Sequence, residues 1–372
     1  MMQDWAQTTL DQIYAKTKAT VQRIGPSAIP YIAEDGHYQA DMAKKDIIWW
    51  TNGFWGGTLW QLNHYRPDAA LAAAAIANEV DLDQAFLKYQ GLHHDVGFMW
   101  LPTAVAHYRL DGDDRAYWRG RHAADLLAGR YNPVGKYLRS WNRDRAGWVI
   151  IDSMINIQLL YWASAVTKDP RFKEIANNHA DTVMQNHVRA DGSVAHIVIF
   201  DPNTGAALRT DGGQGYEVGS SWSRGQAWAL YGFALAYHHT HEARYLETAK
   251  RVAHYFLANI ENTDYVPLVD FRAPQEPQTF DTSAGTTAAC GLLEIAKSVS
   301  ENERPLYQNA AEKMLHSISA KYGNFDTATD SILSGATTAY HDEKGQNTNL
   351  IYGDYYFIEG LLRLTGKDFL IW

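Results

Sequence analysis

Apolar residues recur along the chain at the three- and four-residue spacing that is typical of amphipathic helices. The pattern predicts about twelve helices and very little β-structure. One short strand is expected at 194–200, because an apolar run there ends in the strong turn signal DPNTG. The predicted helices span residues 4–23, 54–65, 68–79, 96–109, 115–130, 152–167, 171–187, 222–239, 243–260, 286–300, 305–322 and 352–364.

The predicted helices are joined in pairs by polar turns that resemble one another. The turns GDDRAY at 112–117, KDPRF at 168–172 and HEARY at 241–245 each place an aromatic residue early in the next helix, and NERPLY at 302–307 follows the same theme. They recur roughly every 45 to 75 residues, which is less regular than a solenoid. About six such hairpins predict an all-α fold, an (α/α)6 barrel that forms one domain over residues 1–372. An open solenoid is the alternative, although neither end shows a polar capping repeat.

The long connections lie between the hairpins rather than within them. They span residues 24–48, 131–151, 189–221, 264–285 and 324–351, and they are rich in Gly, Pro, Asn and Asp. Long structured loops at one end of a helical barrel commonly carry the function. We therefore expect the functional site at the end of the barrel where these loops meet.

Composition and charge narrow the class of protein. The chain has 372 residues, 46% of them hydrophobic, and a formal net charge of -9 without a basic stripe, so neither nucleic acid nor a membrane surface is an expected partner. The single Cys290 excludes a disulfide within the chain and a cysteine-rich metal site. Because we find no signal peptide and no membrane-spanning run, we expect a cytoplasmic protein, either a monomer or a weak homo-oligomer.

Aromatic residues are unusually frequent, with 13 Trp, 22 Tyr and 12 Phe. Flat apolar rings stack on the C–H faces of sugars, although a large helical core would also use them. The segment WWTNGFW at 49–55 packs three tryptophans into a turn before a helix, which favours a sugar-stacking platform over a purely structural role. A glycan is therefore the favoured ligand.

Two acids stand where a long loop meets an apolar helix. Asp95 lies in GLHHDVGF, and Asp152 lies in IIDSMIN. Each is well placed to cap a helix N-terminus, which is the structural interpretation. The functional interpretation is that the Asp95 carboxylate faces a cavity, and that apolar surroundings raise the pKa of Asp152 toward the range that general acid–base catalysis needs.

Further candidates surround these acids. Arg224, in SSWSRGQAW at 220–228, could bind a substrate carboxylate with its planar fork, or it could form a structural salt bridge. Tyr340, His341 and Lys344 lie in the loop ahead of the last turn, GDYY at 353–356.

Other chemistries find no support. His93 and His94 are adjacent and cannot easily bind one metal together, and no zinc spacing, GxSxG elbow or phosphate-binding loop is present. We expect no metal and no cofactor.

Seven segments together resemble the unsaturated glucuronyl hydrolases of glycoside hydrolase family 88, in the order found in that family. They run from Trp50 to Tyr356 and so cover most of the chain. The segments are WTNGFW with the later Trp60, LHHDVGF, IIDSMINIQLL, FDPNTG, SSWSRGQAWALYGFALAY, DTSAGTTAACGLLEIA and IYGDYYFIEGLLRL.

The resemblance implies an (α/α)6 barrel and a distinctive reaction. Family members act after polysaccharide lyases, and they hydrate the C4=C5 vinyl ether of the 4,5-unsaturated uronic acid that lyases leave at the non-reducing end of an oligosaccharide. It assigns Asp152 as the general acid/base and Asp95 as the partner that holds ring hydroxyls. It implies glycosaminoglycan fragments as the substrate and substrate contacts from Trp50, His94, Trp141, His196, Gln214, Arg224, Trp228, Tyr340 and Lys344.

One departure from the family concerns sulfate. Members that prefer sulfated substrates carry serines shortly before a lysine in the final loop. Here Ala339 and Asp342 offer no hydroxyl, and Asp342 and Glu343 precede Lys344 and would repel an anion. The sequence therefore predicts a preference for unsulfated substrates, or for substrates with differently placed sulfates.

Three alternatives to this function remain open. An unsaturated rhamnogalacturonyl hydrolase would share the barrel and the chemistry but act on pectin fragments. A sugar epimerase of the N-acylglucosamine type would rely on histidines as acid and base. A glycan-binding barrel without catalysis would keep the tryptophans and have no use for a tuned carboxyl.

Overall fold

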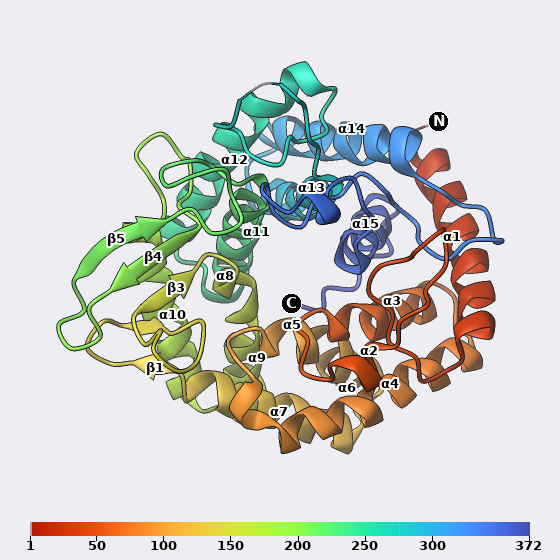
Figure 1. Cartoon of the computed structure of the whole chain (residues 1–372), viewed down its shortest axis with the longest axis horizontal. Helices are drawn as coiled ribbons and strands as arrows, with labels where there is room; N and C mark the ends of the chain where they lie inside the picture. The colour runs from red at the N-terminus through yellow and green to blue at the C-terminus, as the bar shows by residue number, and fades with distance from the viewer. Residues whose placement is uncertain (1, 275) are drawn as a thin grey trace.

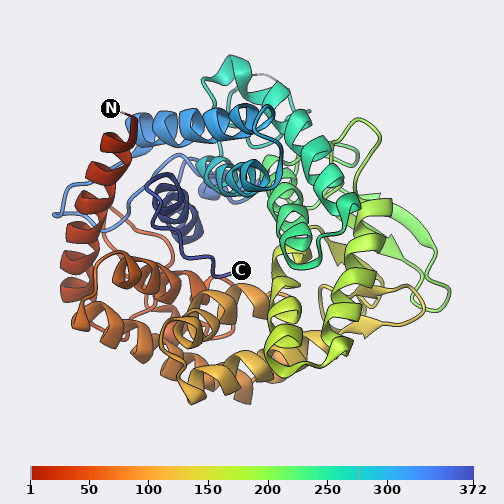
Figure 2. The ribbon, with the colours of Figure 1, turned by 180° about the vertical axis from the view of Figure 1, so that it is seen from behind.

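The computed structural model, which describes residues 2–274 and 276–372, is a barrel of two concentric rings of helices (Figures 1 and 2). Within the described residues, six outer and six inner helical segments alternate along the chain. The outer helices are α1 (Met2–Ile24), α4 (Ala69–Leu87), α7 (Asp114–Ala128), α10 (Pro170–Asn186), α12 (Ala243–Ile260) and α14 (Arg304–Tyr322). The inner segments are α3 (Asn52–Tyr65), α5–η2–α6 (Val96–Trp100, Leu101–Val105 and Ala106–Asp111), α8–α9 (Ser153–Asn156 and Gln158–Thr167), α11 (Ser223–Thr240), α13 (Thr282–Ser298) and α15 (Ile351–Leu364).

The inner ring closes on itself. The last inner helix, α15, packs against both α13 and the first inner helix, α3, while α1 covers α15 and α4 from outside. The predicted all-α (α/α)6 barrel is therefore confirmed, and the open solenoid is excluded because an open array would leave α3 and α15 apart.

Helix boundaries differ from the predicted ones where side chains decide them. Helix α13 begins at Thr282, four residues earlier than expected, because the Asp281 carboxylate accepts a hydrogen bond from the Ser283 N–H at 3.1 Å. The predicted helix over 96–109 is interrupted by a π-helical turn, η2, that contains Pro102. Proline has no N–H to donate, so the regular ladder changes register at this point.

Short strands lie outside the barrel wall. The predicted strand at 194–200 is observed as β4 (Ile197–Phe200), and it pairs antiparallel with β3 (Trp148–Ile150) and β5 (Ala207–Asp211). A second pair joins β1 (Tyr131–Asn132) and β2 (Tyr137–Leu138). The pattern missed β3 because it is only three residues long, and β5 because it is largely exposed and has no buried face to alternate with a polar one. Short helical turns complete the loops, namely α2 (Met42–Lys45), η1 (Tyr89–Gly91), η3 (Glu261–Thr263) and η4 (Glu343–Gly345).

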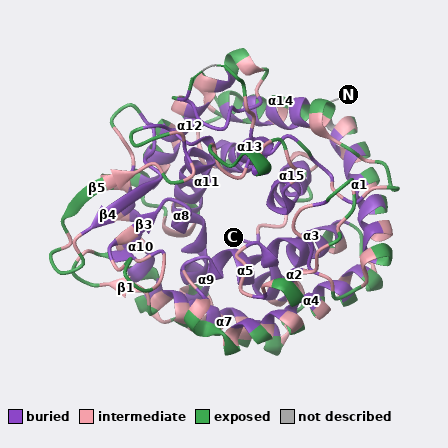
Figure 3. Ribbon diagram, viewed as in Figure 1, coloured by how far each residue is buried: buried purple, intermediate pink, exposed green. Residues whose placement is uncertain are grey.

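The inner helices are buried on nearly every side, as Figure 3 shows. Close approach between them depends on glycine. A side chain at Gly97 would place its Cβ 2.5 Å from the Cα of Asn156, which no backbone tolerates. Helices α5 and α8 can therefore touch, and their N-termini are brought together at the loop end of the barrel.

The opposite end of the barrel is filled by the segment that follows α15. The Trp372 side chain is fully buried, stacks on Tyr356 at 5.6 Å between ring centroids, and donates from Nε1 to Glu359 Oε2 at 2.8 Å. Arg109, near the end of α6, donates to the Leu370 carbonyl at 2.6 Å. Access to the interior is thus blocked at this end. None of the described helices combines the length and the apolar character that a membrane crossing requires.

Candidate active site

All inner helices begin at the same end of the barrel, and the long loops lie just ahead of them. Asp95 is the last residue before α5, and Asp152 is the last residue before α8. The two helices pack against each other, so the two carboxylates enter the same end of the barrel from adjacent inner segments.

Neither carboxylate caps its helix. The Asp95 and Asp152 side chains make no hydrogen bond to the backbone of α5 or α8. Asp68, in contrast, accepts from Ala70 and Leu71, as a true N-cap does. The capping interpretation is therefore wrong for both acids. Each side chain keeps about 12% of its surface exposed, so a small ligand can reach it.

Three groups surround the Asp95 carboxylate. Asn156 donates from Nδ2 to Oδ1 at 3.0 Å, His94 Nε2 lies 3.4 Å from Oδ1, and His93 Nδ1 lies 3.2 Å from Oδ2. Burial alone raises the pKa of Asp95, but His94, His93 and Asn156 outweigh it and hold the pKa below its usual range. Burial also lowers the pKa of His94 to about 4, so this imidazole is neutral at pH 7. Asp95 is therefore an anion that can accept hydrogen bonds from ligand hydroxyls.

Asp152 has one close polar neighbour on its open oxygen. His196 Nε2 lies 3.6 Å from Oδ2, and neither atom has a hydrogen-bond partner among the described residues. Gln214 donates its backbone N–H to His196 Nδ1 at 2.9 Å, a shorter contact than that of Nδ1 with the Gly212 carbonyl at 3.3 Å, so the tautomer with its proton on Nε2, facing Asp152, is favoured. An unsatisfied buried carboxylate oxygen beside an N–H group is poised to exchange a proton with a bound molecule.

Asn156 joins the two acids, a role that the sequence analysis missed. Its Nδ2 donates both to Asp95 Oδ1 at 3.0 Å and to the Asp152 carbonyl at 3.1 Å, and its Oδ1 accepts from the Phe98 N–H at 2.8 Å. The signal was present in IIDSMIN, because Asn156 stands four residues after Asp152 and so on the same side of one helical turn.

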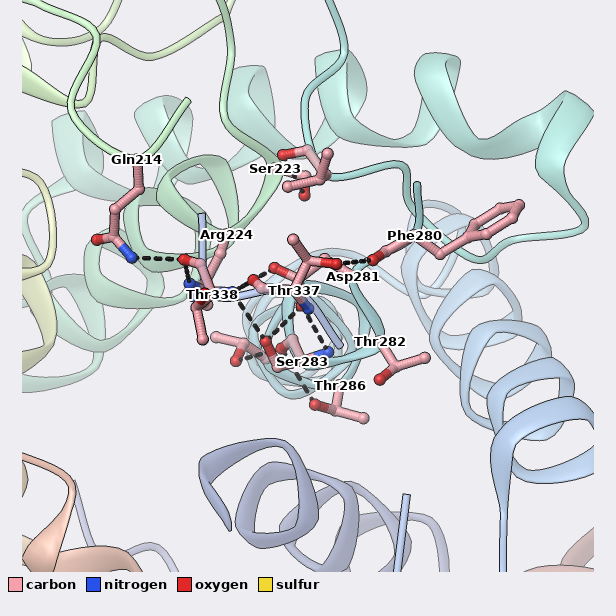
Figure 4. Close-up of polar contacts among 12 residues, drawn as sticks. Gln214, Ser223, Arg224, Phe280, Asp281, Thr282, Ser283, Thr286, Thr337 and Thr338 are labelled. Atoms are coloured by element: carbon pink, nitrogen blue, oxygen red, sulfur yellow. Dashed lines mark hydrogen bonds and ion pairs between the residues drawn. The ribbon is translucent and has the colours of Figure 1, made fainter. Parts of the chain in front are cut away.

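Arg224 is fully buried and holds the final loop in place (Figure 4). Its Nη1 pairs with the Asp281 carboxylate and donates to the Thr337 carbonyl at 2.7 Å, and its Nη2 donates to the Thr338 carbonyl at 2.6 Å. The guanidinium also lies over the Trp222 ring at 4.5 Å. With both terminal nitrogens engaged, this geometry favours the structural salt bridge over the predicted substrate contact.

The loop that Arg224 holds also contains Tyr340 and Lys344. Gln214 donates from Nε2 to the Thr338 carbonyl at 2.7 Å, and Tyr340 donates its N–H to the Gln214 carbonyl at 2.9 Å. Gln214, Tyr340 and His196 thus belong to one connected wall of the site. Lys344 is exposed, and no ion pair engages it in the part of the chain that the structure describes.

The three predicted substrate-binding tryptophans occupy different environments. Trp50 and Trp141 are only partly buried, with Trp50 packed on Tyr352 at 4.9 Å and Trp141 edge-on to His94 at 6.5 Å, so both still present a ring to the site. Trp228 is completely buried and packs against Phe98 at 5.2 Å. The prediction that Trp228 contacts substrate does not fit this position, because the ring has no exposed surface.

The adjacent histidines converge more than the sequence suggested. Ligand-type atoms of His93, His94 and Asp95 all lie within 4.8 Å of one another, which makes them the single candidate metal cluster found among the described residues. The adjacency of His93 and His94 therefore does not by itself argue against a shared metal. The same arrangement also lets both histidines contact the Asp95 carboxylate directly. The expected absence of a metal stays a prediction.

Comparison with known proteins places this chain in a family. No protein-family model matches the chain. The unsaturated glucuronyl hydrolase of Bacillus sp. (strain GL1) is 37% identical over 85% of this chain and 86% of its own length. The unsaturated chondroitin disaccharide hydrolase of Streptococcus agalactiae serotype III (strain NEM316) is 35% identical over 87% and 83% of the two chains. A solved structure of a UGL variant with dGlcA-Glc-Rha-Glc is 33% identical, covers 96% of both chains and has a TM-score of 0.91.

Barrel, paired carboxylates and relatives together define a glycosidase built on a helical barrel. Within that class, the chain belongs to the unsaturated glucuronyl hydrolase family.

Proposed function

We propose that this enzyme releases 4,5-unsaturated uronic acid from the non-reducing end of lyase-generated glycosaminoglycan oligosaccharides by hydrating the C4=C5 bond. The observation that carries the proposal is the Asp152 carboxyl, which makes no helix cap and has a free Oδ2 beside His196 Nε2. A vinyl ether needs a proton donor and then a base, and one carboxyl with an open oxygen serves both steps.

The reaction begins with Asp152 in its protonated form. Its proton passes to C4, the C4=C5 electron pair forms the new C–H bond, and positive charge develops on C5 and the ring oxygen. Water then attacks C5 and returns a proton to the Asp152 carboxylate. The resulting hemiketal opens to a C5 ketone, and the hemiacetal left at C1 collapses to an aldehyde with release of the remaining sugar.

Asp95 serves a different purpose in this scheme. As an anion with Asn156, His93 and His94 around it, it accepts hydrogen bonds from ring hydroxyls and fixes the sugar relative to Asp152. The usual carboxyl-separation rule for retaining and inverting glycosidases does not apply, because no displacement at the anomeric carbon is required.

The preferred sulfation is proposed from the final loop. Asp342 lies beside the lysine expected to face the substrate, and its Oδ2 accepts a hydrogen bond from Thr338 Oγ1 at 2.6 Å. This hydroxyl is therefore engaged, and the adjoining carboxylates of Asp342 and Glu343 oppose an anion near Lys344. Unsulfated substrates, or substrates with sulfate elsewhere, are favoured. The relatives include chondroitin disaccharide hydrolases and a structure specific for heparin, so substrates vary within the family.

The cellular location and the assembly state of the enzyme are proposed from its sequence. We infer a cytoplasmic protein that works as a monomer or weak homo-oligomer, without nucleic acid, membrane or cofactor. Its one cysteine, Cys290, is buried in the core as a free thiol, which suits a reducing compartment.

The experiment that tests the proposal compares unsaturated and saturated substrates. The C4=C5 bond conjugated to the carboxylate absorbs ultraviolet light, so hydration is followed directly as a loss of absorbance. We expect turnover of unsulfated unsaturated chondroitin disaccharide, weaker turnover of its sulfated forms, and none of the saturated disaccharide. Cleavage of the saturated sugar would contradict hydration, faster turnover of an unsaturated rhamnogalacturonan disaccharide would favour the pectin alternative, and a strong preference for sulfate would overturn the specificity.

A further inference from the structure

The three-stranded sheet begins at the catalytic acid and leads away from it. The Ile151 N–H donates to the His196 carbonyl at 3.0 Å, so the β3–β4 ladder continues to the residues next to Asp152. In the other direction the register pairs Ile150 with Ile197 and then Trp148 with Ile199. At about 3.3 Å per residue, Trp148 lies roughly 13 Å along the strand from Asp152. A longer oligosaccharide bound at Asp152 therefore has this ring within its reach.

One face of this sheet is apolar and carries aromatic rings. Ile150, Ile197 and Ile199 form a hydrophobic cluster separate from the barrel core, and Trp141 and Trp148 pack on it. The two indoles meet edge to face at 5.9 Å and remain partly exposed. Trp141 also lies edge-on to His94 at 6.5 Å, so this face is continuous with the site around Asp95. Exposed indole rings are suited to stacking against sugars.

Two arginines flank the same face. The Arg145 guanidinium lies 5.2 Å from the Trp141 ring centroid and 5.0 Å from that of Trp148. Arg209, on β5, pairs in register with Ile199 and therefore projects from the same side of the sheet. Both are exposed, as is most of β5 in Figure 3. In the described part of the chain, no carboxylate lies within ion-pair distance of either guanidinium.

Charge at this edge is opposite to that of the protein as a whole. The chain has a net charge of -9, yet the loop that carries Arg145 also contains Arg139 and Arg143, with Asp144 as its one acid. Asp211 is the acid on the face of the sheet, and it is engaged by the Gly213 N–H at 3.0 Å. A guanidinium without a partner beside an aromatic ring is suited to a sugar that bears a carboxylate or sulfate.

We propose that this face, formed by Trp141, Trp148, Arg145 and Arg209, is a distal subsite for an anionic sugar of a longer substrate. The inference rests on the proposed function. Glycosaminoglycan chains carry a uronate on every second sugar. An unsaturated tetrasaccharide therefore has a second uronate carboxylate, on its third sugar, which the disaccharide lacks. The distal subsite binds that group, and it makes the enzyme select for chain length and charge together.

The test compares unsulfated unsaturated chondroitin di- and tetrasaccharides with the intact enzyme and an R145Q/R209Q variant. The wild type is expected to show a lower KM for the tetrasaccharide, and the variant to raise that KM about tenfold while leaving kcat and the disaccharide KM unchanged. Added salt should raise the tetrasaccharide KM of the wild type more than that of the variant. R115Q/R251Q, which replaces two exposed arginines on α7 and α12, serves as the control with the same change of charge and should alter the KM of neither substrate.

Three results would overturn the distal subsite. The first is an equal KM for both substrates in the wild type, and the second is an unchanged tetrasaccharide KM in the double variant. The third is a KM that the double variant raises equally for the disaccharide and the tetrasaccharide. Both exchanges are on the surface, so the variant should keep its fold, and its thermal midpoint checks this. Absence of any turnover of the unsaturated disaccharide by the wild type would instead contradict the proposed function, so the two failures are distinguishable.

Discussion

The Asn156 side chain donates to the Asp95 carboxylate at 3.0 Å while it also donates to the backbone carbonyl of Asp152 at 3.1 Å. One amide thus fixes Asp95, the acid proposed to orient the sugar, relative to Asp152, the acid proposed to transfer the proton. Its place depends on Gly97, whose missing side chain lets α5 approach Asn156. The separation of the two catalytic functions is therefore set by a helix contact rather than by a flexible loop.

Replacement of Asn156 should change the pH profile of the enzyme. Asn156→Asp is isosteric and keeps an acceptor for the Phe98 N–H, but it puts a second carboxyl beside Asp95. The hydrogen bond from Asn156 lowers the pKa of Asp95, so its loss raises that pKa and moves the acid limb of kcat/KM to higher pH. We expect kcat/KM to fall about 100-fold. Asn178→Asp on α10 is the control, and an unshifted acid limb in Asn156→Asp would contradict this role.

His196 should matter through Asp152 rather than through the stability of the fold. Because the Gln214 N–H fixes the Nε2 proton toward Asp152, His196→Ala removes the one polar group beside Oδ2. We expect kcat to fall about 100-fold or more, with a thermal midpoint close to that of the wild type. His254→Ala, on the outer helix α12, should leave kcat unchanged. Similar kcat values for both variants would show that His196 plays no part.

The sequence predicts the scaffold well because its signals are local. Helical spacing and the repeated turns identify the twelve helices, and the junctions of long loops with apolar helices indicate Asp95 and Asp152 as candidate site residues. The environment of each side chain is not a local property. Trp228 and Trp50 look alike in the chain and both pack on Phe98, yet only Trp228 is fully buried. The partner of Arg224 is 57 residues away along the chain, so its salt bridge could only be offered as an alternative.

Arg224 should contribute mainly to stability. Arg224→Ala leaves the buried Asp281 carboxylate without its cation and the Thr337 carbonyl without its donor. Loss of one partner of a buried pair costs about 3–5 kcal/mol of the free energy of unfolding. The exposed pair of Arg171 and Asp125 provides the control, since Arg171→Ala should cost about 1 kcal/mol or less. Chemical denaturation measures both, and equal losses would show that Arg224 is not the support of the final loop.

Buried histidines should make the fold sensitive to acid. Burial lowers the pKa of His94 and His187 to about 4 and that of His179 and His239 to about 3. In the unfolded chain these histidines bind protons below about pH 6.5. In the folded chain they bind protons only when the pH falls to their lowered pKa values. Stability therefore falls as the pH drops through this window, by up to about 1.4 kcal/mol per pH unit for each histidine.

Thermal melting between pH 7.5 and pH 5 measures this effect. His239→Phe removes one such group, and its ring replaces one that stacks on Tyr161 at 5.0 Å. The variant should lose less stability over this range than the wild type does. The exposed His122→Gln should follow the wild type. A melting temperature that does not change between pH 7.5 and pH 5 would contradict the depressed pKa values.

The central claim is that Asp152 donates the proton and activates the water, and Asp152→Asn tests it most directly. The amide keeps the shape of the side chain but cannot supply the proton or accept one from water. The measurement is the ultraviolet absorbance of unsaturated chondroitin disaccharide during incubation with each enzyme, with binding followed by calorimetry. The account predicts rapid loss of absorbance with the wild type and none with Asp152→Asn, which still binds the sugar. Loss of absorbance at a comparable rate in Asp152→Asn would contradict it.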